Sequence, residues 1–154
     1  MNNIEDYRIS KLRNYLFEII NTLTENRNYQ INADFLGNVD DYSLDKIPTN
    51  TEIEDWIIGV QNKRDVYSFR SRKEYSQDTI NNLINIGFFE EFEKEIKSNN
   101  DKGILPDIKN IQSIKCLNCG TLVKANGTEA TFDIQIEITY IENNEREVIS
   151  LWKR

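Results

Sequence analysis

Apolar residues recur at intervals of three and four in two stretches of the chain, and each stretch predicts an amphipathic helix. The first covers residues 4–23, and the second covers residues 78–98, with Asp78 as its expected N-cap. The first apolar stripe consists of Ile9, Leu12, Leu16, Ile19, Ile20 and Leu23. The second begins with Ile80, Leu83 and Ile84 and continues with Phe89, Phe92 and Ile96. Gly87 lies in the middle of the second stretch, where glycine costs about 1 kcal/mol relative to alanine, so we expect a break or kink there.

Alternation of apolar and polar residues predicts strands elsewhere. The clearest is residues 132–140, where every second residue is apolar, and Asn126-Gly127 before it indicates the turn of a hairpin. Residues 55–75 predict two strands joined around Gln61 to Asp65, and residues 29–33 predict a short strand. Residues 37–52 are polar, have few apolar anchors and include Pro48, so we expect a surface loop there.

The order of these elements is helix, strands, helix and long hairpin, which predicts an α+β fold. We expect an antiparallel β-sheet with two main helical regions packed on one face, in a single domain over residues 1–154. Residues 143–154 form a candidate C-terminal arm. Its apolar side chains, which include Leu151 and Trp152, either fold back onto their own sheet or reach into a neighbouring subunit.

Composition fits one globular domain, because 38% of the 154 residues are hydrophobic and 29% are charged. No apolar run approaches the roughly 18 residues that a membrane span needs, and the polar N-terminus is not a secretory signal. We therefore expect no association with a membrane. The formal charge of -7 argues against bulk binding to nucleic acid.

One basic cluster stands out against this acidic background: Arg64, Arg70, Arg72 and Lys73. A solvated strand face and a contact with an acidic partner explain it about equally well. The alternation of arginine with Tyr67 and Phe69 also suggests a site where the bases of single-stranded nucleic acid stack on the rings. The negative charge of the whole chain makes this the weaker interpretation.

The chain contains no histidine, and this excludes Ser-His-Asp and Cys-His catalysis and every zinc site with a histidine ligand. We therefore expect that the protein is not an enzyme. Cys116 and Cys119 form a CxxC pair, which is half of a zinc knuckle or a redox pair. Two cysteines do not complete a four-ligand site, and on a strand their side chains would point to opposite faces. We interpret them as structural cysteines and expect no metal and no cofactor.

Four short segments in one order resemble a family of small phage proteins. They are Val66-Tyr67-Ser68-Phe69-Arg70-Ser71-Arg72, Ile86-Gly87-Phe88-Phe89-Glu90, Gly103-Ile104-Leu105-Pro106 and the closing hairpin, within residues 56–142. The family is encoded in the tail or head-tail module of Firmicutes phages and prophages. Its members are often labelled minor capsid proteins, and they resemble phage tail terminator, or tail completion, proteins.

The resemblance implies a structural protein of a phage virion or a phage-tail-like bacteriocin (tailocin), assembled in the cytoplasm of the bacterial host. A tail terminator forms a hexameric ring that caps the tail tube, ends its polymerisation and joins the tail to the head or collar. The implied partners are further copies of the chain, the tail tube protein and a sheath or head-tail connector protein. On this hypothesis the basic cluster, with Leu151 and Trp152, lies at subunit interfaces. The alternatives are a head-completion or adaptor protein on the portal side, a nucleic-acid-binding module and, less favoured, a Cys-based metal or redox protein.

Overall fold

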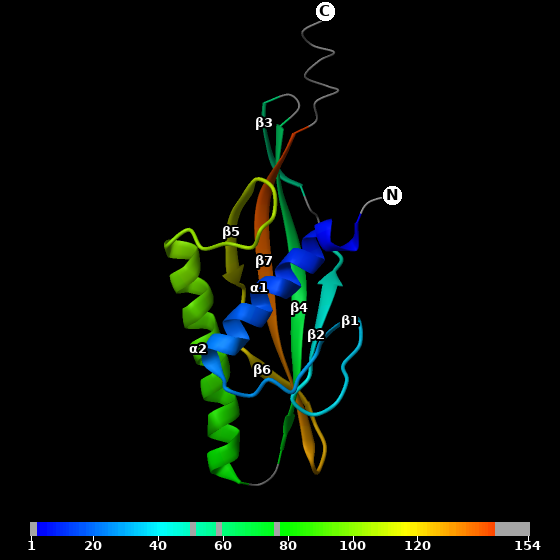
Figure 1. Cartoon of the computed structure of the whole chain (residues 1–154), viewed down its shortest axis with the longest axis vertical. Helices are drawn as coiled ribbons and strands as arrows, with labels where there is room; N and C mark the ends of the chain where they lie inside the picture. Colours follow the sequence, from blue (N-terminus) through cyan, green and yellow to red (C-terminus); the bar gives the residue numbers. More distant parts are fainter. Residues whose placement is uncertain (1–2, 50–51, 58–59, 76–77, 144–154) are drawn as a thin grey trace, which may run out of the picture.

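Two long antiparallel strands form the spine of the molecule (Figure 1). The computed structural model describes residues 3–49, 52–57, 60–75 and 78–143. Strands β4 (Val60–Glu74) and β7 (Glu129–Asn143) pair along their whole length. Side chains alternate between the two faces of the sheet, so Tyr67 and Phe69 are buried in the core while Arg70 points to the other side.

Shorter strands extend this spine on both sides. On one side β2 (Tyr42–Ile47) pairs with β4, and β1 (Ile31–Ala33) pairs with β2. Further along the same edge of β4, β3 (Glu52–Ile57) pairs with the start of β4. On the other side β5 (Ile111–Cys116) and β6 (Thr121–Ala125) pair with successive parts of β7. The path through the sheet is β1-β2-β4-β7-β5. The β1–β2 pair is parallel and the other pairs are antiparallel, so the sheet is mixed rather than wholly antiparallel as expected.

Two helices cover one face of the sheet, which confirms the α+β class. After a short 3-10 turn, η1 (Ile4–Asp6), helix α1 (Arg8–Leu23) crosses over β4 and β7, and α2 (Thr79–Asp101) runs beside the β5 and β6 edge (Figure 1). The side chain of Asp78 accepts a hydrogen bond from the backbone N–H of Ile80, which confirms the predicted N-cap. None of the helices among the described residues is long and apolar enough to cross a membrane.

The interruption expected at Gly87 is wrong, because α2 is assigned as one helix through this position. Phe89, Phe92 and Ile96 follow it and are buried against the sheet. Their burial is worth several times the roughly 1 kcal/mol that glycine costs within a helix.

Two predictions for the first half of the chain are also wrong. The loop expected over residues 37–52 contains β2, where Tyr42 and Leu44 are buried and the Tyr42 ring stacks on Phe69 with centroids 5.1 Å apart. The connection expected around Gln61 to Asp65 lies within β4, since these residues pair with β7 and the chain changes strand between β3 and β4. In both cases pairing with a neighbouring strand decides the structure of a polar segment.

The core lies between the helices and the sheet. It contains the buried apolar residues of α1, the alternating residues of β4 and β7, and an aromatic stack in which Phe69 lies 5.4 Å from Phe92. The α1 residues in it are Leu12, Tyr15, Leu16, Ile19 and Ile20, four of which belong to the predicted stripe.

Candidate functional site

The four residues of the basic cluster all lie on β4, but they do not form one free patch. Arg64, Arg70 and Arg72 are on the sheet face opposite the helices, whereas Lys73 is one residue out of step and lies at the end of the core-facing side. The Lys73 ammonium lies 4.9 Å from the ring centroids of both Tyr42 and Phe88.

Each cation of the cluster has an anion or acceptor within the chain. These contacts are Arg64–Glu137 at 3.3 Å, Arg70–Asp45 at 2.6 Å, Arg72–Glu129 at 3.7 Å with a hydrogen bond to the Gly37 carbonyl, and Lys73–Asp40 at 3.8 Å. The cluster therefore ties β2 and β7 to β4. Its contact with an acidic partner stays a prediction, and the described pairs supply a structural explanation for all four residues.

The two aromatic residues on which the nucleic-acid interpretation depends are buried. Tyr67 and Phe69 are 1% and 0% exposed, because they point into the core and not to the face that carries the arginines. A base has no access to either ring. Leu151 and Trp152, the other predicted interface residues, lie outside the described residues.

The two cysteines lie where the edge of the sheet is interrupted. Cys116 ends β5, residues 117–120 bridge to β6, and both thiols are free. Burial, with Glu93 and Cys119 nearby, raises the pKa of Cys116 to about 12. Burial raises the pKa of Glu93, although a hydrogen bond from Cys119 opposes this effect. Both thiols therefore lie near one carboxyl group of α2, and the expectation that they point to opposite faces is wrong because the strand is broken between them.

This environment is unlike that of a redox pair. A reactive thiol needs a lowered pKa, and that of Cys116 is raised. Among the described residues no group of three or more cysteine or acidic side chains is arranged to hold a metal ion.

A buried charge cluster around Asp65 was not predicted from the sequence. The side chain of Asp65 is 0% exposed and receives hydrogen bonds from Arg8 Nε at 2.7 Å, the Tyr67 hydroxyl at 3.1 Å and the Tyr140 hydroxyl at 3.2 Å. Lys46 Nζ lies 3.7 Å away. The residues come from α1, β2, β4 and β7, so the cluster joins the first helix to three strands. One signal in the sequence could have indicated it: Asp65 lies two residues before Tyr67, at a strand position whose side chain faces the core.

The electrostatics of this cluster favour the ionised form of Asp65. Burial raises its pKa, but the hydrogen bond and charge of Arg8, with Lys46 and the Tyr67 hydroxyl, outweigh this effect and lower the pKa below its usual value. Burial and the nearby Asp65 charge raise the pKa of Tyr140 to about 12. The carboxylate is fully committed to partners within the chain.

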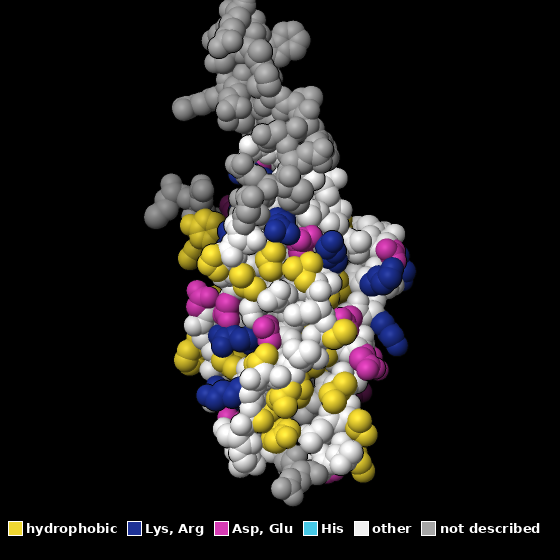
Figure 2. All heavy atoms as spheres, turned by 180° about the vertical axis from the view of Figure 1, so that it is seen from behind, with side chains coloured by type: hydrophobic (Ala, Val, Ile, Leu, Met, Phe, Trp, Pro, Cys, Tyr) yellow, Lys and Arg dark blue, Asp and Glu magenta, His cyan; other side chains and the backbone are white. Residues whose placement is uncertain are grey.

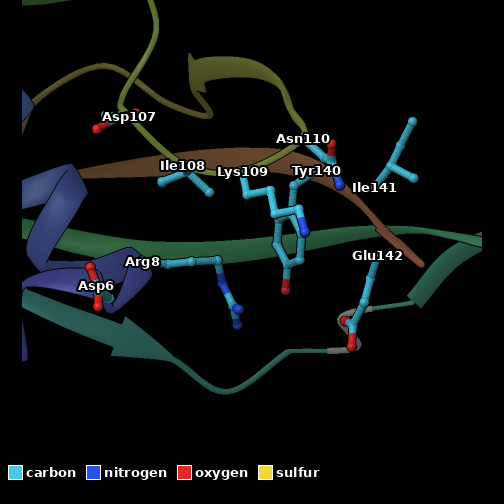
Figure 3. Close-up of a pocket in the computed structure, with 9 residues that line it drawn as sticks. All are labelled: Asp6, Arg8, Asp107, Ile108, Lys109, Asn110, Tyr140, Ile141 and Glu142. Carbon is cyan, nitrogen blue, oxygen red and sulfur yellow. The ribbon is translucent and has the colours of Figure 1, made fainter. Parts of the chain in front are cut away.

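A pocket of about 310 Å³ opens beside this cluster (Figure 3). In Figure 3 Arg8 extends from α1 toward the ring of Tyr140 on β7, and its guanidinium carbon lies 4.5 Å from the centroid of that ring. Lys109 also lines the pocket, but so do the carboxylates of Asp107 and Glu142. The mixture of signs favours neither an anion nor a cation, and the residues best explain how the start of α1 is fixed to the sheet.

A second feature that the sequence did not predict is an exposed apolar surface at one end of the molecule. It comprises two groups of exposed side chains, Ile80, Leu83 and Ile84 in the first turns of α2 and Leu122 and Val123 of β6, and we call them together the apolar end surface. These side chains are between 47% and 68% exposed. Figure 1 places the first half of α2 and the strand β6 in the lower half of the molecule.

The elements that carry the two groups meet in one close contact. A Cβ built on Gly120 would lie 2.5 Å from Phe89, so the backbone before β6 packs directly on α2. From that contact the first half of α2 and the strand β6 both lead toward the same end of the molecule (Figure 1). Residues 80, 83 and 84 were expected to begin the core face of the helix, but they lie on the side away from Phe89 and Phe92.

No protein-family model matches the chain, and no curated protein matches it.

Proposed function

We propose that the protein is a structural subunit of a phage tail or phage-tail-like bacteriocin, a tail terminator. Copies of it form a ring that caps the tail tube, ends polymerisation and joins the tail to the head or collar. The proposal starts from the resemblance of residues 56–142 to phage minor capsid proteins. Three of the segments that carry this resemblance contribute to the main core: Tyr67 and Phe69 belong to it, and Phe88 and Leu105 pack against it.

The observation that carries the proposal is the apolar end surface. Its five aliphatic side chains leave on the order of 350 Å² of apolar area in water, if a fully exposed side chain of this size presents about 120 Å². Apolar patches of a few hundred Å² on a folded chain are often sites of protein contact. An assembly protein needs such a surface.

The chemistry of the described residues points the same way. The buried carboxylate of Asp65 accepts its hydrogen bonds from Arg8, Tyr67 and Tyr140 of the same chain. The face of the sheet opposite the helices carries mixed charges (Figure 2), many of them in cross-strand pairs such as Arg70–Asp45 and Arg64–Glu137. Such a face is suited to a polar contact with a neighbouring protein rather than to a small substrate.

The test is the length of tail tubes that assemble in the presence of this protein. Purified tube protein from the same particle is polymerised alone and with the chain, and tube lengths and end structures are measured by electron microscopy. We expect shorter tubes with rings of this protein at one end. Tube lengths unchanged at a molar excess of the chain, with no density at the ends, would refute the proposal, and binding to a portal-side ring instead would support the adaptor alternative.

A matched pair of variants gives the test its control. Leu83→Glu places a charge in the apolar end surface and is expected to abolish capping. Phe35→Glu makes the same kind of change at a side chain that is 64% exposed but lies after β1, outside that surface, and is expected to cap normally.

A further inference from the structure

The apolar end surface includes an open strand edge. Strand β6 pairs only with β7 among the described strands, and all five of its residues are exposed. Its outer backbone N–H and C=O groups are therefore available to another extended chain. Apolar side chains beside a free strand edge are the combination that β-strand addition uses.

The chain itself contains a segment of matching chemistry. Residues 144–154 follow β7 and read Asn-Glu-Arg-Glu-Val-Ile-Ser-Leu-Trp-Lys-Arg. Val148, Ile149, Leu151 and Trp152 give this segment four apolar side chains in five residues. We propose that residues 144–154 of one copy dock on the apolar end surface of a second copy, as a strand added to β6. The inference rests on the proposed function, because it supplies the contact by which copies would assemble.

Reach rules out docking on the same copy. Phe132 pairs with Leu122 of β6, and β7 then runs eleven residues to Asn143, roughly 36 Å at the ordinary rise of a strand. Figure 1 shows this end of β7 at the opposite end of the molecule from the first half of α2. Trp152 follows Asn143 by nine residues, at most about 32 Å when fully extended. It cannot return to its own β6, so a second copy has to supply the surface.

Charge fixes the direction of the added strand. Lys124 on β6 is exposed and forms no ion pair with the described residues, and Glu90 and Glu91 are exposed on α2 just beyond the Gly120 contact. An antiparallel arm begins beside Lys124 and ends toward α2. This direction places the acidic residues of the arm, Glu145 and Glu147, near Lys124 and its basic end near the two glutamates.

The resulting contact is heterologous, because the donor segment and the acceptor surface are different parts of the chain. Heterologous contacts propagate from copy to copy and form a closed ring when the rotation between copies allows it. The arm would thus link each copy to the next one.

The test measures association of full-length variants by light scattering over a dilution series. The arm variant is Leu151→Glu with Trp152→Glu, the surface variant is Leu83→Glu with Ile84→Glu, and Phe35→Glu is the matched control. We expect the wild-type chain and the control to associate, and both double variants to associate at least about a hundredfold more weakly. All substituted positions on the described surface are exposed, so circular dichroism and thermal unfolding should show the same fold.

Mixing the two double variants is the decisive step. Each retains the half that the other lacks, so an equimolar mixture should form heterodimers although each variant alone is monomeric. A mixture that stays monomeric overturns the inference, and so does a surface variant that associates like the wild type. An arm variant that associates normally while the surface variant does not would show that the surface pairs with itself, which also overturns the inference.

Fluorescence gives a second readout that does not depend on a variant of the surface. The chain has two tryptophans, and Trp56→Phe leaves Trp152 as the only one. Its emission should shift to shorter wavelength as concentration rises, and an emission that is independent of concentration up to the solubility limit overturns the inference. Tube capping is measured separately. Association through the arm without tube capping would refute the proposed function alone. Tube capping by the arm variant would refute this inference alone.

Discussion

Replacing Asp65 by alanine tests whether the buried charge cluster stabilises the fold. The carboxylate has no exposed surface and is the acceptor for Arg8, Tyr67 and Tyr140. The substitution removes all three hydrogen bonds at once and leaves the donors in place. It also removes the anion that fixes the start of α1 to β4.

The expected loss of unfolding free energy depends on whether water can reach each hydrogen-bond donor that loses its acceptor. The Tyr67 hydroxyl is buried, so water does not replace its partner, and an unsatisfied buried donor costs about 1–3 kcal/mol. Tyr140 is 5% exposed and is affected in the same way. The Arg8 side chain is 41% exposed, so water solvates its guanidinium and its share is about 1 kcal/mol or less. We expect Asp65→Ala to lower the free energy of unfolding by about 3 kcal/mol, a large part of the stability of an ordinary domain.

The assay is urea unfolding of the full chain at pH 7, followed by circular dichroism and analysed by linear extrapolation. Asp101→Ala is the matched control, because Asp101 is 61% exposed and, within the part of the chain that the structure describes, forms an ion pair only with Lys97, four residues before it on α2. Such a pair contributes less than about 0.5 kcal/mol. If the two substitutions lower the free energy of unfolding equally, or if Asp65→Ala changes it by less than about 1 kcal/mol, the reasoning is refuted.

Three further predictions follow from the same contacts. The folded-state pKa of Asp65 lies below its unfolded value of about 3.9, so its stabilising effect is complete above that pH and is lost as the pH falls through the folded-state pKa. In urea titrations the difference in unfolding free energy between the wild type and Asp65→Asn should therefore shrink below about pH 4. A difference that stays constant with pH would contradict this. Gly120→Ala should lower the midpoint of thermal unfolding and cost about 1–3 kcal/mol of stability, because the added Cβ meets the inner atoms of the Phe89 side chain. A Cβ at Gly127 meets nothing within 4 Å, so the control Gly127→Ala should change the stability by less than about 0.5 kcal/mol. Equal effects of the two substitutions would contradict the packing argument. A maleimide reagent at pH 7 should modify the exposed Cys119 before Cys116, whose pKa is raised to about 12, as peptide mass spectrometry over time would show; faster modification of Cys116 would contradict the stated burial.

Long periodic segments were the part of the fold that the sequence predicted well. The stripe on α1 and the alternation on β7 each involve many residues, so one apolar position more or less does not change the result. The Asp78 cap was also predictable, because a cap is a local interaction.

Strand β2 shows why other segments were missed. It offers only Tyr42, Leu44 and Ile47 as apolar residues, and its polar residues are satisfied by contacts distant in sequence or specific to the fold. The Ser43 hydroxyl, on a residue with no exposed surface, donates to Asp45 at 2.6 Å, and Asp45 in turn accepts from Arg70 on β4. Only the pairing with β4 turns this polar stretch into a strand.

Local sequence patterns could not predict the Asp65 cluster or the apolar end surface, for the same reason. The Asp65 cluster joins residues 8, 46, 65, 67 and 140, and no spacing rule connects them. The apolar end surface was visible in the sequence as apolar residues, but periodicity says only that a face is apolar. It does not say whether the same chain or another one covers that face.

The size of the apolar end surface sets what kind of assembly it supports. Burying about 350 Å² of apolar area on the acceptor is worth roughly 9 kcal/mol, and association costs an estimated 4–15 kcal/mol in lost freedom of motion. The two amounts are similar, so a single contact of this kind is weak and depends on concentration. A closed ring changes the balance, because each copy then makes two such contacts and the last one forms at high effective concentration. A chain whose interface is weak in pairs and strong in a closed ring would associate only at high concentration in solution, and more readily on a template that gathers the copies. That behaviour is what a subunit that caps a finished tube requires.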